Sequence, residues 1–152
     1  MSLVYKHGDI LIPNTSDRGV VVCHQVNCNG VMGAGLAKQV RIKHPHVYRR
    51  YKEKCDAGAA HLGDVQYVSC LDSDKYIIAN IFGQIGFGRD KQYTSYGALE
   101  RAFDNLLDTF PNDIIRIPYG MGCGLGGGKW DMVLLIIEQR LSFIADVEIW
   151  QL

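Results

Sequence analysis

Residues 19–37 read GVVVCHQVNCNGVMGAGLA, a nearly continuous apolar run followed by a glycine-rich loop. The first part, 19–26, is rich in β-branched residues, which is typical of a strand that is buried on both faces of a sheet. Apolar residues at helical spacing then begin at Gly35 and continue to about Lys43. This order of buried strand, glycine loop and helix predicts a parallel α/β unit.

The same order returns near the end of the chain. A strand at 114–117 stops at Pro118, the segment 118–128 is rich in glycine, and a helical face starts at Trp130. Apolar patterns predict further strands at 3–5, 64–70, 75–82 and 147–150, and further helices at 45–55 and 96–110. Strands that alternate with helices predict a three-layer α/β/α sandwich with a mixed, largely parallel sheet.

Length and composition limit the class of protein. The chain has 152 residues, 47% of them apolar, and its 16 basic residues balance 16 acidic ones. We therefore expect a single domain over residues 1–152, with no membrane segment and no direct nucleic-acid binding, because a nucleic-acid surface leaves a basic surplus. Five cysteines without metal-ligand spacing, and no visible signal peptide, predict a cytoplasmic protein without a metal site. We also expect a monomer without a cofactor.

The two glycine-rich segments are candidates for an anion site. In an open α/β sheet, ligands bind beyond the carboxyl ends of the strands, where both segments are expected to lie. Glycine lets a backbone approach a ligand closely, and the N-terminus of the following helix favours negative charge. Glycines also mark turns and helix caps, but six of them within residues 120–128 exceed what one turn needs. Two such loops could hold a diphosphate between them.

Common phosphate and nucleophile motifs do not fit these segments. A Walker A loop needs a hydroxyl residue after its lysine, but Trp130 follows Lys129. The G-x-G-x-x-G pattern that ends at Gly127 leaves too little chain for a dinucleotide-binding unit. A thiol nucleophile elbow would need glycine where Met121 stands, two residues before Cys123.

The motifs resemble the macrodomain family instead. The matching residues are Gly8-Asp9-Ile10, Val26-Asn27-Cys28, VMGAGLA at 31–37, Ile117-Pro118, GMGCGLGG at 120–127 and Trp130. They run in order through nearly the whole chain. The branch that they resemble contains terminal ADP-ribose protein glycohydrolase and small proteins that process ADP-ribose-1''-phosphate. The resemblance implies a macrodomain fold and a module that binds ADP-ribose or a derivative, with an ADP-ribosylated protein as a further partner.

The resemblance also implies a set of binding residues. Asp9 would accept a hydrogen bond from the adenine 6-amino group, with the Ile10 amide nearby, and Asn27 would face the distal ribose. The first loop would hold one phosphate and the second loop the other, through backbone amides that suit a diphosphate. The residues of these loops are Val31, Met32, Gly33, Ala34, Gly35 and Leu36, and Pro118, Gly120, Met121, Gly122, Cys123, Gly124, Leu125 and Gly126.

The chain departs from the glycohydrolase branch at two catalytic places. That branch has a lysine after the strand corresponding to 76–82 and an aspartate after Gly-Cys-Gly-Leu, where this chain has Gln84 and Gly126. Neither can act as an amine nucleophile or an acid. Asn27 and Gln84 remain the catalytic candidates. Two hypotheses stay open: hydrolysis of a 1''-phosphate, acyl or protein linkage on the distal ribose, and a reader of ADP-ribose without catalysis.

Overall fold

The computed structural model describes residues 2–152 and contains one six-stranded sheet in the order β1-β6-β5-β2-β4-β3. All neighbouring strands run parallel except β3, which pairs antiparallel with β4 at the edge. The strands are β1 (Ser2–His7), β2 (Val20–Asn27), β3 (Val65–Cys70), β4 (Ser73–Gln84), β5 (Ile114–Pro118) and β6 (Asp146–Gln151). The predicted mixed, largely parallel sheet is confirmed.

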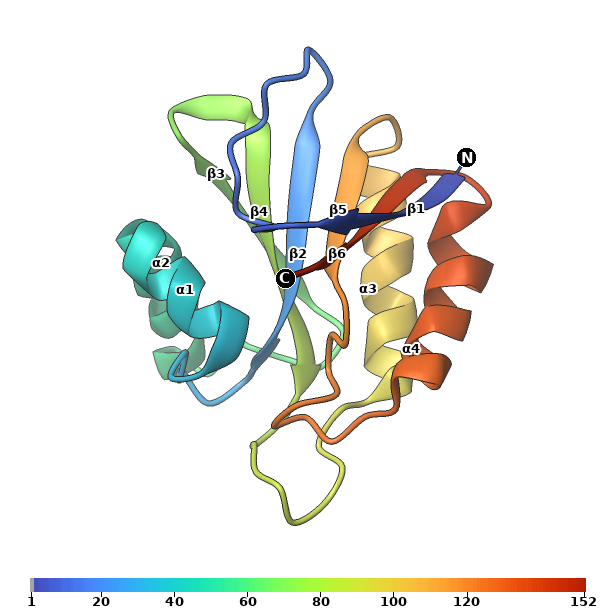
Figure 1. Cartoon of the computed structure of the whole chain (residues 1–152). Helices are drawn as coiled ribbons and strands as arrows, with labels where there is room; N and C mark the ends of the chain where they lie inside the picture. Colours follow the sequence, from blue (N-terminus) through green and yellow to red (C-terminus); the bar gives the residue numbers. More distant parts are fainter. Residues whose placement is uncertain (1) are drawn as a thin grey trace.

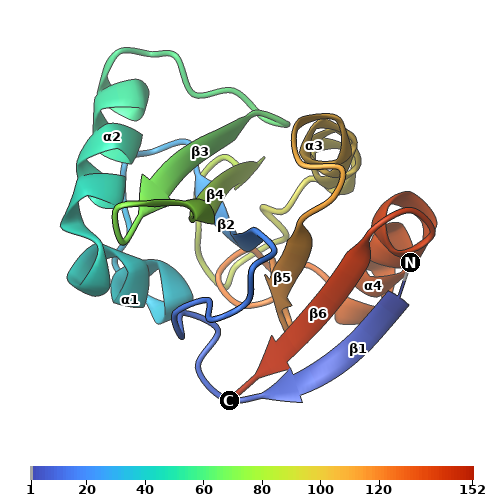
Figure 2. The same ribbon diagram turned by 90° about the horizontal axis from the view of Figure 1, so that it is seen from above.

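Helices cover both faces of this sheet (Figures 1 and 2). Two helices, α1 (Gly35–Lys43) and α2 (Pro45–Asp56), lie on one face, and α3 (Tyr96–Thr109) and α4 (Trp130–Ile137) lie on the other. A π-helical segment, Glu138–Ser142, continues α4. The predicted three-layer α/β/α architecture is therefore confirmed. No helix within residues 2–152 has the length and apolar character needed to span a bilayer.

Strand β2 contributes to the hydrophobic core on both faces of the sheet. Val21 and Cys23 pack in the larger cluster with side chains of α3 and α4, such as Phe103. Val20 and Val22 alternate with them and pack on the opposite face with residues of α1 and α2. Successive side chains of a strand point to opposite faces, so a strand in the middle layer must be apolar on both. This requirement explains the nearly continuous apolar run at residues 19–26.

The topology brings three loops to one edge of the sheet (Figure 1). Strands β2, β4 and β5 are neighbours and run parallel, so their carboxyl ends lie side by side. The first glycine loop follows β2 and leads into α1, and the second follows β5 and leads into α4. The segment 85–95, which follows β4, joins them there. Below, these are called loop 1 (28–34), the β4–α3 loop (85–95) and loop 2 (119–129).

Candidate functional site

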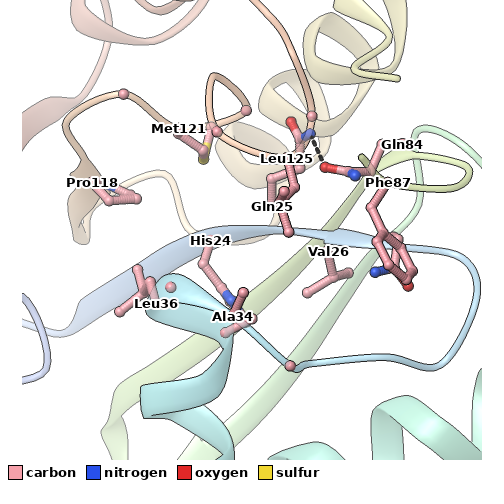
Figure 3. A pocket seen from close by; sticks show the side chains of 18 of the residues that line it. His24, Gln25, Val26, Ala34, Leu36, Gln84, Phe87, Pro118, Met121 and Leu125 are labelled. Carbon is pink, nitrogen blue, oxygen red and sulfur yellow. Dashed lines mark hydrogen bonds between the residues drawn. The ribbon is translucent and has the colours of Figure 1, made fainter. Parts of the chain in front are cut away.

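The three loops enclose a cavity of about 610 Å³ (Figure 3). Its floor comes from the end of β2, loop 1 and the start of α1 form one wall, and loop 2 forms the other. The cavity therefore lies where open α/β sheets bind ligands, beyond the carboxyl ends of parallel strands. Its lining includes most of the sequence-predicted site residues: Asn27, Val31, Gly33, Ala34, Gly35, Leu36, Gln84, Pro118, Gly120, Met121, Gly122, Gly124, Leu125 and Gly126.

A second cavity of about 620 Å³ adjoins the first and contains Asp9 and Ile10. The two cavities share Gly35, Leu36, Pro118 and Tyr119, so together they form one elongated depression. Below, the first is called the main cavity and the second the Asp9 cavity. The sequence predicted that residues 9–10 would serve the same ligand as the two loops, and the structure brings all three segments together.

Two predicted residues lie outside the lining. Met32 is buried and packs with Val26, Tyr51 and Phe82 beneath loop 1. Cys123 packs against the larger core, and its thiol donates to the Met121 carbonyl at 3.5 Å. Because both side chains pack into the protein, they anchor the loops, and only backbone groups of these two residues could contact a ligand.

The carboxylate of Asp9 is held in place from two sides. Its Oδ1 accepts the backbone N–H of Leu11 at 2.9 Å, and its Oδ2 forms an ion pair with Lys43 Nζ at 2.6 Å. The Lys43 ammonium and the Leu11 amide hold the pKa of this carboxyl below its usual range. The segment itself is fastened by Arg116, which donates to the carbonyls of Ile10 and Ile12 at 3.0 and 2.7 Å. Asp9 is therefore an ionised, pre-oriented acceptor.

Loop 1 is shaped by Asn27 together with a tyrosine that the sequence did not single out. Asn27 Oδ1 accepts the N–H of Asn29 at 2.9 Å, and its Nδ2 donates to the Val31 carbonyl at 2.9 Å. The buried Tyr51 hydroxyl donates to Asn27 Oδ1 at 2.6 Å and accepts the N–H groups of Gly30 and Val31. Burial raises the Tyr51 pKa, so the hydroxyl stays protonated. Asn27 therefore organises loop 1, and the amide group has a second N–H that this set of hydrogen bonds does not use.

The start of α1 leaves its first backbone amides without side-chain partners. The residue before the helix, Ala34, has no side chain that could cap it, and the first turn contains no acidic residue. A helix N-terminus with free N–H groups carries a partial positive charge and favours an anion. Because Ala34, Gly35 and Leu36 line the main cavity, this charge is directed at its interior.

The loop glycines that do not have a positive φ fall into two structural classes. A Cβ on Gly124 would meet nothing within 4 Å, and one on Gly33 would meet only Val31 Cγ1 at 3.6 Å, although both glycines line the main cavity. A Cβ on Gly126 or Gly128 would instead lie 2.6 or 2.9 Å from the Gly122 carbonyl oxygen. The second class is required by packing within loop 2. The first class is not, so its open space is available to a ligand.

One end of the main cavity is a wall of neutral amides. Gln84 is buried, donates to the Gly86 carbonyl at 2.8 Å and accepts from Gln25 Nε2 at 2.7 Å (Figure 3). Gln25 also donates to Thr94 Oγ1, which donates to the Gly122 carbonyl at 2.7 Å. This network ties the β4–α3 loop to loop 2. Below it is called the amide wall.

Acids, amines and thiolates that could do covalent or general acid–base chemistry are not presented to the cavity. The lining contains no Asp, Glu, Lys or Cys side chain, and it does not include the nearby residues Asp90, Lys91 and Asp131. Burial raises the pKa of Cys28 to about 11, and it raises that of Cys123 as well. Both thiols are therefore protonated at neutral pH. The arrangement can orient a ligand and a water molecule, but it supplies no nucleophile.

His24 lies in β2 and is buried, but only one of its ring nitrogens has a hydrogen-bond partner within residues 2–152. Gln66 Nε2 must face the Arg50 carbonyl at 3.1 Å, so Gln66 Oε1 faces Asn80 Nδ2 at 3.1 Å. Asn80 Oδ1 then faces His24 Nε2 at 2.5 Å, and Nε2 carries the proton. Nδ1 is left as a buried acceptor without a hydrogen bond within residues 2–152. Burial lowers the His24 pKa to about 4.

This burial predicts an acid-sensitive contribution to stability. The folded-state pKa of about 4 lies below the ordinary value of 6.5, so the stabilisation is complete above pH 6.5 and is lost as the pH falls toward 4. The unfolding free energy of the wild type should therefore fall by about 2 kcal/mol more than that of His24→Gln between pH 7 and pH 5. Urea unfolding at the two pH values measures the difference. Equal losses in both proteins would show that folding does not lower the His24 pKa.

Metal ligands are not gathered anywhere in the described chain. Within residues 2–152, no group of three or more His, Cys, Asp or Glu side chains could hold a metal ion. The features of the site are backbone amides, one helix N-terminus, the Asp9 carboxylate at the far end, neutral side-chain amides, the buried His24 and the exposed Arg89.

Comparison with known proteins identifies relatives along most of the chain, although no family model matches it. A DNA ADP-ribosyl glycohydrolase of Mycobacterium tuberculosis is 30% identical over 149 residues, which cover 91% of this chain and 37% of the relative. An ADP-ribose 1''-phosphate phosphatase of Saccharomyces cerevisiae is 29% identical over 165 residues, which cover 91% of this chain and 92% of that protein. The chain thus spans just over a third of the mycobacterial relative's length and nearly all of the yeast relative's.

Solved structures share the fold over nearly the whole chain. A Bacteroides thetaiotaomicron protein of unknown function superposes with a TM-score of 0.88 at 26% identity, covering 100% of this chain and 99% of that one. The macrodomain of Thermus aquaticus DarG has a TM-score of 0.75 at 25% identity, with coverage of 98% and 96%. Thermosipho africanus DarTG in complex with ADP-ribose, at 21% identity, shares the fold with a TM-score of 0.74 and coverage of 97% and 41%. With the sheet order and the two glycine loops described above, these likenesses show that the chain belongs to the macrodomain family.

Proposed function

We propose that this protein binds ADP-ribose and hydrolyses a substituent on its distal ribose. The observation that carries the proposal is the open space above Gly33 and Gly124, which face the same cavity from opposite walls. A diphosphate placed there would meet backbone amides of both loops and the N-terminus of α1. The names of the two relatives, an ADP-ribosyl glycohydrolase and an ADP-ribose 1''-phosphate phosphatase, support the same ligand.

The Asp9 cavity suits the adenine. Its lining combines the apolar side chains of Ile10, Leu36 and Trp150 with the carboxylate of Asp9, which matches a flat ring that has an amino group on one edge. An ionised carboxylate only accepts hydrogen bonds, and the adenine 6-amino group can donate one. With the diphosphate between the two loops, the distal ribose then lies at the amide wall.

Hydrolysis at that end would depend on positioning. The remaining N–H of Asn27 and the amide of Gln84 would orient the distal ribose and an attacking water molecule, which raises the rate by fixing reacting atoms in line. A covalent lysyl intermediate is not expected, because Gln84 stands where the glycohydrolase branch has lysine. Asn27 and Gln84 are thus positioning residues of the proposed reaction.

A second candidate function is a reader that binds ADP-ribose, free or attached to a protein, without turnover. The observation that favours it is the lack of acid, amine and thiolate groups among the residues that line the main cavity. For either function we further propose a monomer in the cytoplasm, and the five free cysteines support the reducing compartment.

Incubation with defined ligands separates the two functions. Purified protein would be mixed with ADP-ribose-1''-phosphate, O-acetyl-ADP-ribose or an ADP-ribosylated peptide, and the products would be read by mass. Hydrolysis of any of the three, lost in Gly124→Val, supports the enzyme. Saturable ADP-ribose binding without turnover of any of the three would support the reader function instead.

Asp9→Ala is expected to weaken ADP-ribose binding by about 1.5 to 3 kcal/mol, the usual cost of a hydrogen bond to a charged group. Wild type should prefer ADP-ribose over inosine diphosphate ribose, which lacks the amino group, and Asp9→Ala should lose that preference. Lys43→Ala is the matched control, because it removes the ion-pair partner but keeps the carboxylate. Equal affinity of the wild type for the two ligands, measured by calorimetry, would assign Asp9 to the turn that it makes with Leu11.

A further inference from the structure

The main cavity has one permanently charged side chain, Arg89, which the proposed function does not use. None of the other residues that line this cavity is acidic, and most are apolar residues, glycines or neutral amides. His24, the only other basic residue among them, is held neutral by burial. The side chain of Arg89 makes no hydrogen bond or ion pair within residues 2–152, and the neighbouring Asp90 is occupied by the Tyr93 hydroxyl at 2.7 Å. The guanidinium is therefore exposed and free to bind an anion.

The β4–α3 loop that carries Arg89 is fastened on both sides. Asn29 Oδ1 of loop 1 accepts the Gly86 N–H at 2.6 Å, and the Leu125 carbonyl of loop 2 accepts the Gly88 N–H at 3.0 Å. Farther along, the Gly126 carbonyl accepts the N–H of Tyr93 at 2.7 Å. Arg89 is thus presented from a backbone that is tied to both walls of the cavity.

These ties also place Arg89 at one particular end of the site. The loop contacts Leu125, Gly126 and Gln84, which line the main cavity but not the Asp9 cavity. Phe87 of the same loop also lines the main cavity, with its ring on the side of Val26 (Figure 3). With the adenine at Asp9 and the diphosphate between the loops, the group nearest to Arg89 is whatever extends beyond the distal ribose.

We propose that Arg89 determines specificity by binding a terminal anion of the phosphate class on the distal ribose, so that the site distinguishes a ligand with this group from ADP-ribose itself. The inference rests on the proposed function. A planar guanidinium binds a phosphate through two parallel N–H···O bonds, whereas a neutral sugar hydroxyl offers no charge to pair with it. The amide wall adds no negative charge that would repel a dianion.

The test compares two ligands, ADP-ribose and the methylene phosphonate analogue of ADP-ribose-1''-phosphate, which cannot be hydrolysed. By calorimetry, the wild type is expected to bind the phosphonate about tenfold more tightly than ADP-ribose. Arg89→Gln should abolish this preference while keeping the ADP-ribose affinity within about twofold, and Arg89→Lys should keep part of it. Lys91→Gln removes a neighbouring charge outside the lining and should retain the full preference.

The outcomes separate the inference from the function on which it rests. Equal affinity of the wild type for the two ligands, or a full preference in Arg89→Gln, overturns the role of Arg89 and leaves ADP-ribose binding intact. A loss of the preference in Lys91→Gln as large as that in Arg89→Gln also overturns it, because the effect would then be one of overall charge. Failure of the wild type to bind either ligand overturns the proposed function as well.

Discussion

Replacement of Gly124 or Gly33 by valine is expected to abolish ADP-ribose binding and to leave the fold intact. Neither glycine has a backbone conformation that requires glycine, and a Cβ at either position would lie 3.6 Å or more from other protein atoms. The branched side chain would instead fill the space between the loops where the proposed diphosphate lies. We expect the affinity to fall by at least about 100-fold, or roughly 2.7 kcal/mol.

Calorimetry with ADP-ribose and thermal unfolding would be measured on the same samples. Gly97→Val is a matched control, since it makes the same change on the exposed surface of α3, where a Cβ would meet Arg101 Nη1 at 3.6 Å. This control should bind like the wild type. A folded Gly124→Val protein with wild-type affinity would mean that loop 2 does not hold the diphosphate.

Gly126→Ala is expected to destabilise the protein by about 2 kcal/mol, within the range for overpacking, although it adds only a methyl group. The Cβ would collide with Thr94 Oγ1 and would lie 2.6 Å from the backbone oxygen of Gly122, which cannot move without deforming loop 2. Gly124→Ala, two residues earlier in the same loop, should change the unfolding free energy by less than about 0.5 kcal/mol. Denaturant unfolding of the two variants measures this difference. Both make the same substitution in the same loop, so a difference in unfolding free energy reports the packing around residue 126.

This packing also bears on catalysis. Gly126→Asp would restore the acid of the glycohydrolase branch in sequence, but its Cβ meets the same two atoms. We therefore expect a destabilised protein without gain of glycohydrolase activity. A Gly126→Asp variant as stable as the wild type would show that loop 2 can accommodate a side chain at this position, contrary to the contacts described above.

Much of the fold could be predicted from local patterns. The β-branched run of β2 and the spacing of Leu99, Phe103 and Leu106 in α3 reflect burial on one or two faces, and the structure buries them accordingly. Pro45 and Pro118 marked the start of α2 and the end of β5, because proline fits the first helical turn and cannot continue a parallel ladder. The π-helical turn after α4 had no such local signal.

The parts of the candidate site that use backbone amides could be predicted, because such loops are enriched in glycine. Glycine density predicted both loops, and family resemblance added Asp9. Tyr51, Gln25 and Arg116 could not be predicted, because each acts on a segment that lies far away in sequence and near it only in the folded chain. A buried tyrosine or arginine has the same appearance in sequence as an ordinary core or surface residue.

Asn27 shows the same limit for a residue that the sequence did select. The resemblance implies that it faces the distal ribose, and it does line the main cavity. Its side chain also makes hydrogen bonds with the Asn29 amide, the Val31 carbonyl and the Tyr51 hydroxyl. Replacement of Asn27 therefore alters the shape of loop 1 along with any contact to a sugar, and the bonds of Gln84 to Gly86 and Gln25 give that residue a similar double role.

Titration of the wild-type protein with ADP-ribose in a calorimeter tests whether the two glycine loops and the Asp9 cavity form one ligand site. We expect saturable binding of one ADP-ribose per chain, with a dissociation constant of about 10 μM or lower. ADP should compete with it, and ribose-5-phosphate, which lacks the adenine and one phosphate, should bind far more weakly. Absence of ADP-ribose binding at millimolar concentration, or equal affinity for ribose-5-phosphate, would contradict the proposed site.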